Sequence, residues 1–189
     1  MFPKKVKNKY IMDIKEAKKI SLSDLDILNK LEGRTNIVLY KNLNKFNNIE
    51  SVLKDNSAVI LYEKQPKNGH WVALMRNYNR KRKRPTIEFF DSYGMFPDDE
   101  KKYIDNGFLN QSDQKYNKLS ELLVKASDKY DIEFNNYRLQ KKTKDVSTCG
   151  RHVISRILLK DLDIDEYNKF MKSFKGYSPD DIATIISEL

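Results

Sequence analysis

Apolar residues along this chain gather in short runs that are rich in β-branched and aromatic side chains, a pattern typical of buried strands. Five runs of this kind occur, at residues 37–40, 58–62, 71–76, 86–90 and 132–139. The short segment 77–85 separates the third run from the fourth. We therefore expect 71–76 and 86–90 to pair as an antiparallel hairpin whose tip lies in that segment.

Other apolar residues recur at helical spacing. Ser21 or Ser23 can cap a short helix that runs to about Leu31, and Gly33 would stop it. Near the end of the chain, Ser178 is a suitable N-cap. Pro179 fits the first helical position after it. Further helical segments are expected at 49–53 (one turn), 149–160, 165–175, 179–188 and 114–130, the last with an apolar face of Tyr116, Leu119, Leu122, Leu123 and Ala126.

Strands mixed with helices in this order indicate an α+β fold. The chain has 189 residues and contains neither an internal repeat nor a linker long enough to divide it. We therefore expect a single domain over residues 21–189. Residues 1–20 are rich in lysine and only weakly periodic, which predicts a loosely attached basic arm.

Composition narrows the class of protein. Hydrophobic residues make up 39% and charged residues 33%, which is typical of a soluble globular protein. The formal net charge is +9. This charge is compatible with an anionic partner, most commonly nucleic acid, and equally with a basic enzyme that binds none. No signal peptide or membrane-spanning segment is visible, so we expect neither secretion nor membrane attachment.

The single cysteine, Cys149, excludes an internal disulfide and suits a reducing compartment in which the thiol stays usable. One cysteine and two histidines also argue against a structural zinc site. A lone cysteine is often only a small buried apolar residue. Here it precedes a helical run, and the chain also offers His70 in a Gly-His-Trp stretch and Asp91 in a Phe-Asp-Ser stretch. These three groups are the minimum set for catalysis by a thiolate nucleophile.

The predicted hairpin would bring two of these residues together. If its turn is symmetric about residues 80 and 81, His70 stands directly opposite Asp91, at a distance that suits an imidazole–carboxylate hydrogen bond. Alternation would put Trp71 on the other face of the sheet. The face that carries His70 and Asp91 would also carry Val72, Leu74, Ile87 and Phe89, and we expect the helix after Cys149 to pack there through Val153, Ile154, Ile157 and Leu158.

The position of Cys149 at a helix N-terminus would favour its thiolate form. Gly150 would let a substrate or another backbone approach closely. His152 is a rival general base, because positions three apart on a helix are neighbours. No carboxylate that would orient it is evident from the sequence, so His70 is preferred.

A dense cationic run, Arg80-Lys81-Arg82-Lys83-Arg84, lies at the tip of the predicted hairpin. Its simplest interpretation is a solvated turn. The functional alternatives are contact with DNA and a signal resembling those for nuclear localisation.

Four blocks of the chain together resemble a known family. The blocks are Gly-His-Trp at 69–71, Phe-Phe-Asp-Ser-Tyr-Gly at 89–94, Tyr-Arg-Leu-Gln at 137–140 and Thr-Cys-Gly-Arg-His at 148–152. In this order they resemble the adenain-like and SUMO-specific cysteine proteases. The likeness is greater to the maturation proteases of virophages, such as those of the mavirus type, and of related large DNA viruses. It spans about residues 20–160.

The resemblance implies a role for each matched residue and a fold in which the nucleophile begins a helix packed on a mostly antiparallel sheet. Cys149 would be the nucleophile, His70 the general base and Asp91 the residue that orients His70. Gln140 would donate its amide to the oxyanion together with the backbone N–H of Cys149. Gln140 precedes the cysteine by nine positions, whereas six or seven are usual in the family, so a backbone amide is the alternative donor. Trp71 would pack structurally or flank the substrate groove, near Gly150.

By this resemblance the chain is expected to be a cysteine endopeptidase that processes viral capsid precursors through a thioester intermediate. Removal of ubiquitin-like modifiers and acetyl transfer are alternatives that use the same triad, and a basic nucleic-acid-binding module is the alternative without catalysis. The sequence requires no cofactor, although DNA activates the adenovirus protease, and DNA or a peptide is the activator to test. We expect a monomer, found in the virion and in the viral factory of the host cytoplasm, whose partners are capsid proteins and non-specific DNA.

Overall fold

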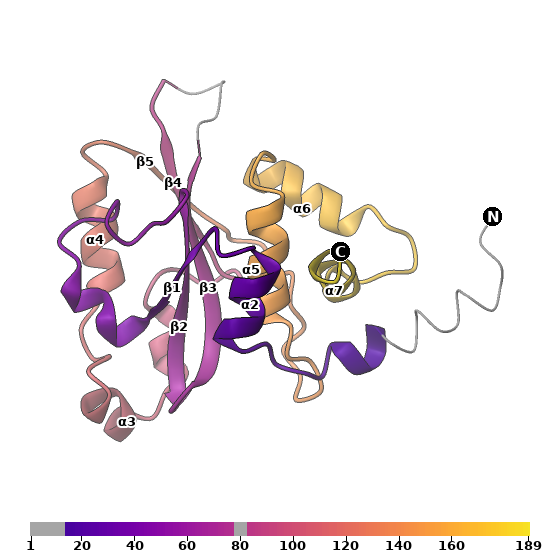
Figure 1. Cartoon of the computed structure of the whole chain (residues 1–189), viewed down its shortest axis with the longest axis horizontal. Helices are drawn as coiled ribbons and strands as arrows, with labels where there is room; N and C mark the ends of the chain where they lie inside the picture. Colours follow the sequence, from indigo (N-terminus) through magenta and orange to yellow (C-terminus); the bar gives the residue numbers. More distant parts are fainter. Residues whose placement is uncertain (1–13, 78–82) are drawn as a thin grey trace.

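The computed structural model describes residues 14–77 and 83–189. A central five-stranded sheet lies between two layers of helices (Figure 1). The strands follow one another across the sheet in chain order. They are β1 (Asn36–Leu39), β2 (Ser57–Gln65), β3 (Asn68–Asn77), β4 (Thr86–Phe90) and β5 (Asp131–Phe134).

The three central strands pair antiparallel, and the short edge strands β1 and β5 add to them in parallel. The longest ladders are therefore antiparallel, and the predicted α+β class with a mostly antiparallel sheet is confirmed. Strand β4 coincides with the predicted run 86–90. Strands β2 and β3 extend beyond their predicted runs until they meet at a tight turn near Lys67, whose φ is +62°.

The helices divide between the two faces of the sheet. In Figure 1, α3 and α4 lie on one side, whereas α2, α5, α6 and α7 lie on the other. The α-helices are α2 (Asp24–Lys30), α3 (Asn106–Gln111), α4 (Lys118–Ala126), α5 (Cys149–Leu158), α6 (Ile164–Lys172) and α7 (Pro179–Ser187). The chain also forms two 3-10 helices, η1 (Tyr40–Lys45) and η2 (Asp99–Tyr103).

Capping explains where three of these helices begin. Ser23, Asp163 and Ser178 each accept a hydrogen bond from the backbone N–H three residues later, and the acidic side chain there bonds back to the cap. This reciprocal capping box satisfies two donors that would otherwise lack partners. The predicted cap at Ser178, with Pro179 after it, is confirmed.

The sheet separates two apolar cores. Alternate residues of β3 and β4, Val72, Leu74, Ile87 and Phe89, pack against α4. The residues between them, Trp71, Ala73, Met75 and Phe90, pack against α5. The even positions of β3 therefore face one helical layer and the odd positions face the other, as expected from the two-residue period of a strand.

Two predicted elements are shorter in the structure. In each case a buried side-chain amide at the boundary, before the helix or after the strand, binds backbone groups elsewhere. The helix expected over 114–130 begins only at Lys118, and Tyr116 is 70% exposed. Gln114 instead bonds the backbone of Glu63 through both ends of its amide, which holds the chain outside the helix. The strand expected over 132–139 ends at Phe134, because the amide of Asn135 binds the carbonyl oxygens of Asp91 and Tyr137.

Helix α5 is fixed to the sheet by a buried ion pair. Arg156 donates two hydrogen bonds to the carboxylate of Glu88 on β4, at 2.7 and 2.6 Å. The same guanidinium donates to the carbonyl oxygens of Leu159 and Leu162 and so ends the helix. Leu158 was expected on the buried stripe of α5 but is 45% exposed, because it lies in this last turn.

The described part of the predicted N-terminal arm is not loosely attached. Ser147 donates its backbone N–H to the carbonyl oxygen of Lys18 at 2.7 Å, and the Lys18 ammonium pairs with Asp181 on α7. Arg151 donates to the carbonyl oxygen of Ala17. Residues 14–20 are thus held beside the start of α5. Residues 1–13 lie outside the described part of the chain. Among the described residues, no helix combines the length and the apolar character that crossing a bilayer requires.

Candidate active site

His70 and Asp91 lie together, although the predicted hairpin register is wrong by two residues. The ladder pairs Ala73 with Phe90, so continuing it places Asp91 opposite Val72. The ladder starts at Thr86, directly after Pro85, and pairs it with Asn77, whereas the predicted register would pair Thr86 with Met75. A shift of two residues keeps every side chain on its predicted face. His70 and Asp91 are consequently diagonal neighbours, with Nε2 3.2 Å from Oδ1.

Asp91 is held in place by the turn that follows β4. Its Oδ1 accepts the backbone N–H of Tyr93 at 2.6 Å, and its carbonyl oxygen accepts from the amide of Asn135. The Nε2 of His70 is at ion-pair distance from this carboxylate but is not aligned with it as in a regular hydrogen bond. Both side chains are buried, with exposed fractions of 3% and 1%.

The ring of Tyr93 covers the imidazole of His70. The two rings are stacked with centroids 4.8 Å apart and planes 18° apart. Burial, and then the negative charge of the Cys149 thiolate, raise the pKa of Tyr93, which keeps its hydroxyl neutral. The tyrosine thus excludes water from one face of the histidine.

Helix α5 approaches the site from the face opposite to the one predicted. Its apolar stripe packs with Trp71, Ala73 and Phe90, whereas α4 covers the face that carries His70. The half-buried Cys149 nevertheless reaches His70, because the pairing of β4 with β3 stops at Ala73. Beyond that point the edge of β3 is open, and the sulfur lies close enough to the His70 side chain and to the backbone N–H of Trp71 for both to lower the pKa of the thiol.

The electrostatics of the pair favour a thiolate and an imidazolium. Burial opposes ionisation of Cys149, but the hydrogen bond and charge of His70, with the N–H groups of Trp71 and Gly150, outweigh it and lower the pKa of the thiol. Burial likewise opposes charge on His70. The Asp91 carboxylate and the Cys149 sulfur reverse that effect and hold the pKa of the imidazole well above its usual value. Each group thus stabilises the charged form of the other.

Gln140 is buried beside the residue that follows Asp91. Its Oε1 accepts a hydrogen bond from the hydroxyl of Ser92 at 2.7 Å, and its backbone N–H donates to the carbonyl oxygen of Ser92. Since the carbonyl end of the amide is occupied, the NH₂ end is directed elsewhere. The next N–H along the chain, that of Lys141, donates to Asp180 on α7 at 3.0 Å.

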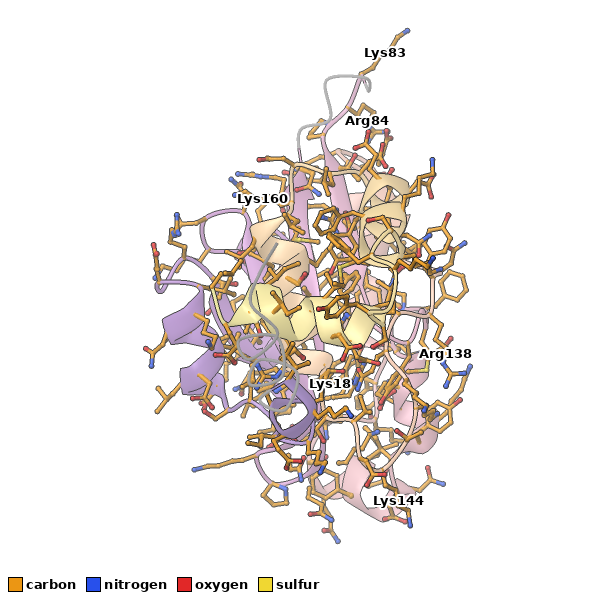
Figure 2. All side chains as sticks on the ribbon, turned by 90° about the vertical axis from the view of Figure 1, so that its right-hand side faces the viewer. Lys18, Lys83, Arg84, Arg138, Lys144 and Lys160 are labelled. Carbon is orange, nitrogen blue, oxygen red and sulfur yellow. The ribbon has the colours of Figure 1, made fainter. Side chains whose placement is uncertain are left out.

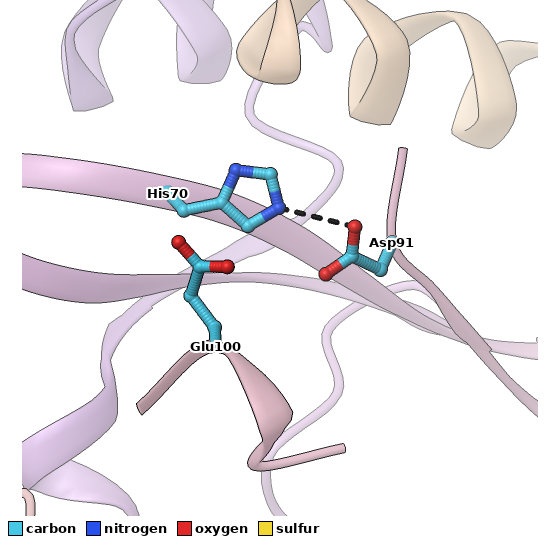
Figure 3. Close-up of side chains that lie close together, drawn as sticks. All are labelled: His70, Asp91 and Glu100. Carbon is cyan, nitrogen blue, oxygen red and sulfur yellow. Dashed lines mark ion pairs between the residues drawn. The ribbon is translucent and has the colours of Figure 1, made fainter. Parts of the chain in front are cut away.

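A second carboxylate, not identified from the sequence, lies against His70. Glu100 on η2 is 2% exposed, and Figure 3 shows it on one side of the imidazole, with Asp91 at Nε2 and the other ring nitrogen pointing away from both. Ligand atoms of the three residues lie within 4.8 Å of one another, a grouping that could hold a metal ion. The ammonium of Lys64 already lies 2.5 Å from Glu100 and neutralises it. No short-range signal marks Glu100, because it lies in a 3-10 turn without periodicity.

His152, the rival base, also has a carboxylate partner, contrary to expectation. Its Nε2 lies 3.0 Å from Oδ1 of Asp180, which the chain brings back from α7, 28 positions later. The Nδ1 of His152 is buried without a hydrogen-bond partner, and the ring is fully inaccessible to solvent. His70 is the histidine whose proximity lowers the pKa of the Cys149 thiol. The geometry therefore favours His70 as the base.

Trp71 and Gly150 are packed against each other and against α2. Trp71 is 6% exposed, and its indole N–H donates to the carbonyl oxygen of Leu22. A Cβ at Gly150 would lie 3.1 Å from Leu22 and 3.5 Å from Trp71. Of the two roles expected for Trp71, packing is the one that its contacts fit, and Gly150 admits Leu22, from the segment before α2. Their contact with a substrate stays a prediction.

The basic run at the hairpin tip is described only in part. Arg80, Lys81 and Arg82 lie outside the described residues. Arg84 donates to the carbonyl oxygen of Ser127, so it has a structural contact, and Lys83 is exposed. The cations labelled in Figure 2 are spread over the molecule, from Lys83 at one end to Lys144 at the other. They do not form one compact patch in that view.

Comparisons with known proteins were made by sequence and by structure. No protein-family model matches the chain. A protein of Sputnik virophage, described as uncharacterized protein V9, is 40% identical over 179 residues, which cover 93% of this chain and 98% of V9. Among solved structures, the crystal structure of the ASFV pS273R protease superposes with a TM-score of 0.51 at 14% identity, over 92% of this chain and 68% of that one. At this identity the likeness shows a shared fold, that of a viral protease.

Proposed function

The chain belongs to the family of the virophage protein V9, and on that premise we propose that it is a cysteine endopeptidase with Cys149 as nucleophile. One observation carries the proposal. The sulfur at the start of α5 lies close enough to the His70 imidazole for that ring to lower the pKa of the thiol, and the buried Asp91 carboxylate lies 3.2 Å from Nε2 of the same ring. The protease-like fold supports the same reaction class. A thiolate, a base and a group that orients the base are what acyl transfer by cysteine requires.

The reaction would proceed in two stages. The Cys149 thiolate attacks the scissile carbonyl carbon, the C–N bond breaks, and His70 gives its proton to the leaving amine, so a thioester remains. Neutral His70 then removes a proton from water, which attacks the thioester and releases the carboxylic acid and the thiol. Asp91 stabilises the imidazolium throughout and keeps the ring oriented. The Tyr93 ring limits solvent access to His70.

Two donors would stabilise the oxyanion. The backbone N–H of Cys149 is at the helix start, and the Gln140 amide has its carbonyl end fixed by Ser92, which leaves the NH₂ group to donate. The nine-residue spacing between Gln140 and Cys149 is accommodated by the loop 141–147, which is largely exposed.

The substrates would be the capsid precursor proteins of the virus that encodes the chain, and the sites of action the virion and the viral factory. The viral origin of the homologue and of the structural neighbour supports this choice. DNA contact through the hairpin tip would be an accessory that concentrates the enzyme on the genome, and its phosphate contacts would make it sensitive to salt.

The test is to incubate wild-type and Cys149→Ala protein with the major capsid protein and to identify the fragments by mass spectrometry. Cleavage by the wild type alone is expected, with new termini that define the cut site. His70→Ala should be inactive as well. His152→Ala is the comparison at the second histidine and should retain much more activity than His70→Ala. Cleavage by the Cys149→Ala protein would refute the proposal. Binding to DNA without cleavage, unaffected by alkylation of Cys149, would favour a nucleic-acid-binding module instead.

A further inference from the structure

We propose that Asp180 on α7 is a positioning residue, which aligns the segment carrying Gln140 with the start of the nucleophile helix. This inference rests on the proposed function, since it assigns Asp180 to the oxyanion side of that site. It concerns a residue about 30 positions beyond the block that contains Cys149, on a helix that contributes no group to the reaction itself.

The Asp180 carboxylate joins three groups from two segments of the chain. Its Oδ2 accepts the backbone N–H of Lys141, the residue after Gln140. Its Oδ1 accepts the hydroxyl of Thr148, the residue before Cys149, and lies 3.0 Å from Nε2 of His152, one turn further along α5. The two ends of the loop 141–147 are therefore fastened to one carboxylate.

This arrangement fixes the oxyanion donors relative to the sulfur. Ser92 binds Gln140 from the side of Asp91, and Asp180 binds the following N–H from the side of α5. Ser92 thus holds Gln140, and Asp180 holds the N–H of the next peptide bond. Donors must lie at hydrogen-bond distance from the developing oxyanion, and a displacement of about 1 Å weakens transition-state binding strongly.

The carboxylate is buried and charged, which suits this role. Asp180 is 3% exposed, and Thr148 and His152 are fully buried. Burial opposes the charge on Asp180, but the hydrogen bonds from His152, Thr148 and Lys141 outweigh it and lower its pKa. A charged acceptor gives shorter and stronger hydrogen bonds than a neutral one. The carboxylate therefore holds the loop more firmly than an amide would.

Helix α7 does not need this carboxylate in order to form. Its N-terminus is capped by Ser178 with Asp181, and Ile182 and Ala183 pack in the core beneath it. Asp181 also pairs with Lys18. The side chain of Asp180 can therefore be changed while the helix keeps its cap and its apolar contacts.

The experiment compares Asp180→Ala, Asp180→Asn and Ile185→Ala with the wild type. Ile185 packs partly on the core from α7 but makes none of the three bonds, so it is the matched control for loosening the helix. Five quantities are measured: kcat and KM for a cleavable peptide, the affinity of a peptide aldehyde, the rate of Cys149 alkylation by iodoacetamide, and the thermal midpoint. Alkylation requires the thiolate but no oxyanion donor, whereas the aldehyde adduct forms an oxyanion.

We expect Asp180→Ala to lower kcat about 30-fold or more, with KM within threefold and alkylation within threefold of wild type. Aldehyde affinity should fall in parallel with kcat/KM. Asp180→Asn should be intermediate, because an amide of the same shape keeps part of the hydrogen bonding. Ile185→Ala should lower the thermal midpoint without changing kcat. An unchanged kcat in Asp180→Ala would overturn the inference. So would an equal loss of kcat in Ile185→Ala, if the two variants have the same thermal midpoint.

Hydrogen exchange separates this inference from the proposed function. Deuterium uptake by the peptide 139–148 should be faster in Asp180→Ala than in wild type or Ile185→Ala. If wild-type protein neither cleaves peptides nor binds the aldehyde, the proposed function fails. The uptake result then still decides whether Asp180 holds the loop, and unchanged uptake refutes it.

Discussion

Cys149 and His70 meet at the edge of β3, although α5 packs on one face of the sheet and His70 belongs to the other. The contact exists because β4 leaves the ladder after Phe90 and opens that edge. The sulfur lies beside the backbone N–H of Trp71 at this open edge. The His70 side chain, from the neighbouring position on β3, extends past the strand edge toward the sulfur. The position at which β4 ends therefore decides whether Cys149 and His70 can meet.

The first prediction concerns the ionisation of the thiol. The pKa of Cys149 is lowered by His70, and the pKa of His70 is raised, so the charged pair is present between the two pKa values. Activity should fall as pH drops through the lowered pKa of Cys149, and again as pH rises through the raised pKa of His70. The pH dependence of iodoacetamide alkylation measures the thiol directly, without a substrate.

The control for this prediction is His70→Ala. Without the imidazolium, burial dominates, and the midpoint of alkylation should move to or above the ordinary thiol pKa of about 8.5. Because Cys149 is the only cysteine, the modified mass reports this one residue. A midpoint that does not move would mean that His70 leaves the thiol unaffected.

The second prediction is that Asp91→Asn lowers kcat by about 10²–10⁴-fold while the protein stays folded. An amide has nearly the same shape and can still accept the Tyr93 N–H, but it no longer stabilises an imidazolium. Its NH₂ group can also stabilise the wrong tautomer of His70. Kinetics on a peptide substrate, with circular dichroism to check the fold, would test this. Activity within threefold of wild type would contradict a role for Asp91.

The third prediction concerns Glu100, which lies beside His70 and is paired with Lys64. Glu100→Gln removes a buried negative charge and leaves the Lys64 ammonium nearby, so the imidazolium should become less stable. The alkaline limit of activity should therefore move to lower pH. The double variant Glu100→Gln/Lys64→Met removes both charges, so its alkaline limit should return most of the way to that of the wild type. An unchanged alkaline limit would show that Glu100 has no electrostatic effect on His70.

The fold class and much of the element order could be predicted because they depend on short-range patterns. Strand β4 and the caps of α2 and α7 follow from alternation and from residues within three positions of each other. The juxtaposition of His70 and Asp91 also survived the error in register, since a shift of two residues does not change the face of a strand.

Contacts between distant segments could not be predicted in the same way. The face on which α5 packs depends on where β4 ends, and the partner of His152 comes from a helix that begins 27 positions later. Glu100 lies in a turn set by Asp98, which binds the hydroxyls of Tyr40 and Ser120 in the buried layer below. Nothing local to any of these residues marks the contact.

The last prediction concerns the stability of α5, the helix that carries Cys149. Arg156 on α5 and Glu88 on β4 form a buried, two-pronged ion pair, with exposed fractions of 0% and 1%. Arg156→Met would leave Glu88 charged and unpaired in the core, and would remove the donor to the carbonyl oxygen of Leu162. Breaking one partner of such a pair costs about 3–5 kcal/mol. Urea unfolding should show a loss of this size.

The double variant Arg156→Met/Glu88→Leu should recover most of the lost stability, because it leaves no unpaired charge in the apolar layer. Lys125→Met, which breaks an exposed pair with Glu121 on α4, is the matched control and should change stability by less than about 0.5 kcal/mol. Since the pair lies two helical turns from Cys149, each folded variant should keep its alkylation rate. A single variant as stable as the wild type would show that the pair contributes nothing to anchoring α5.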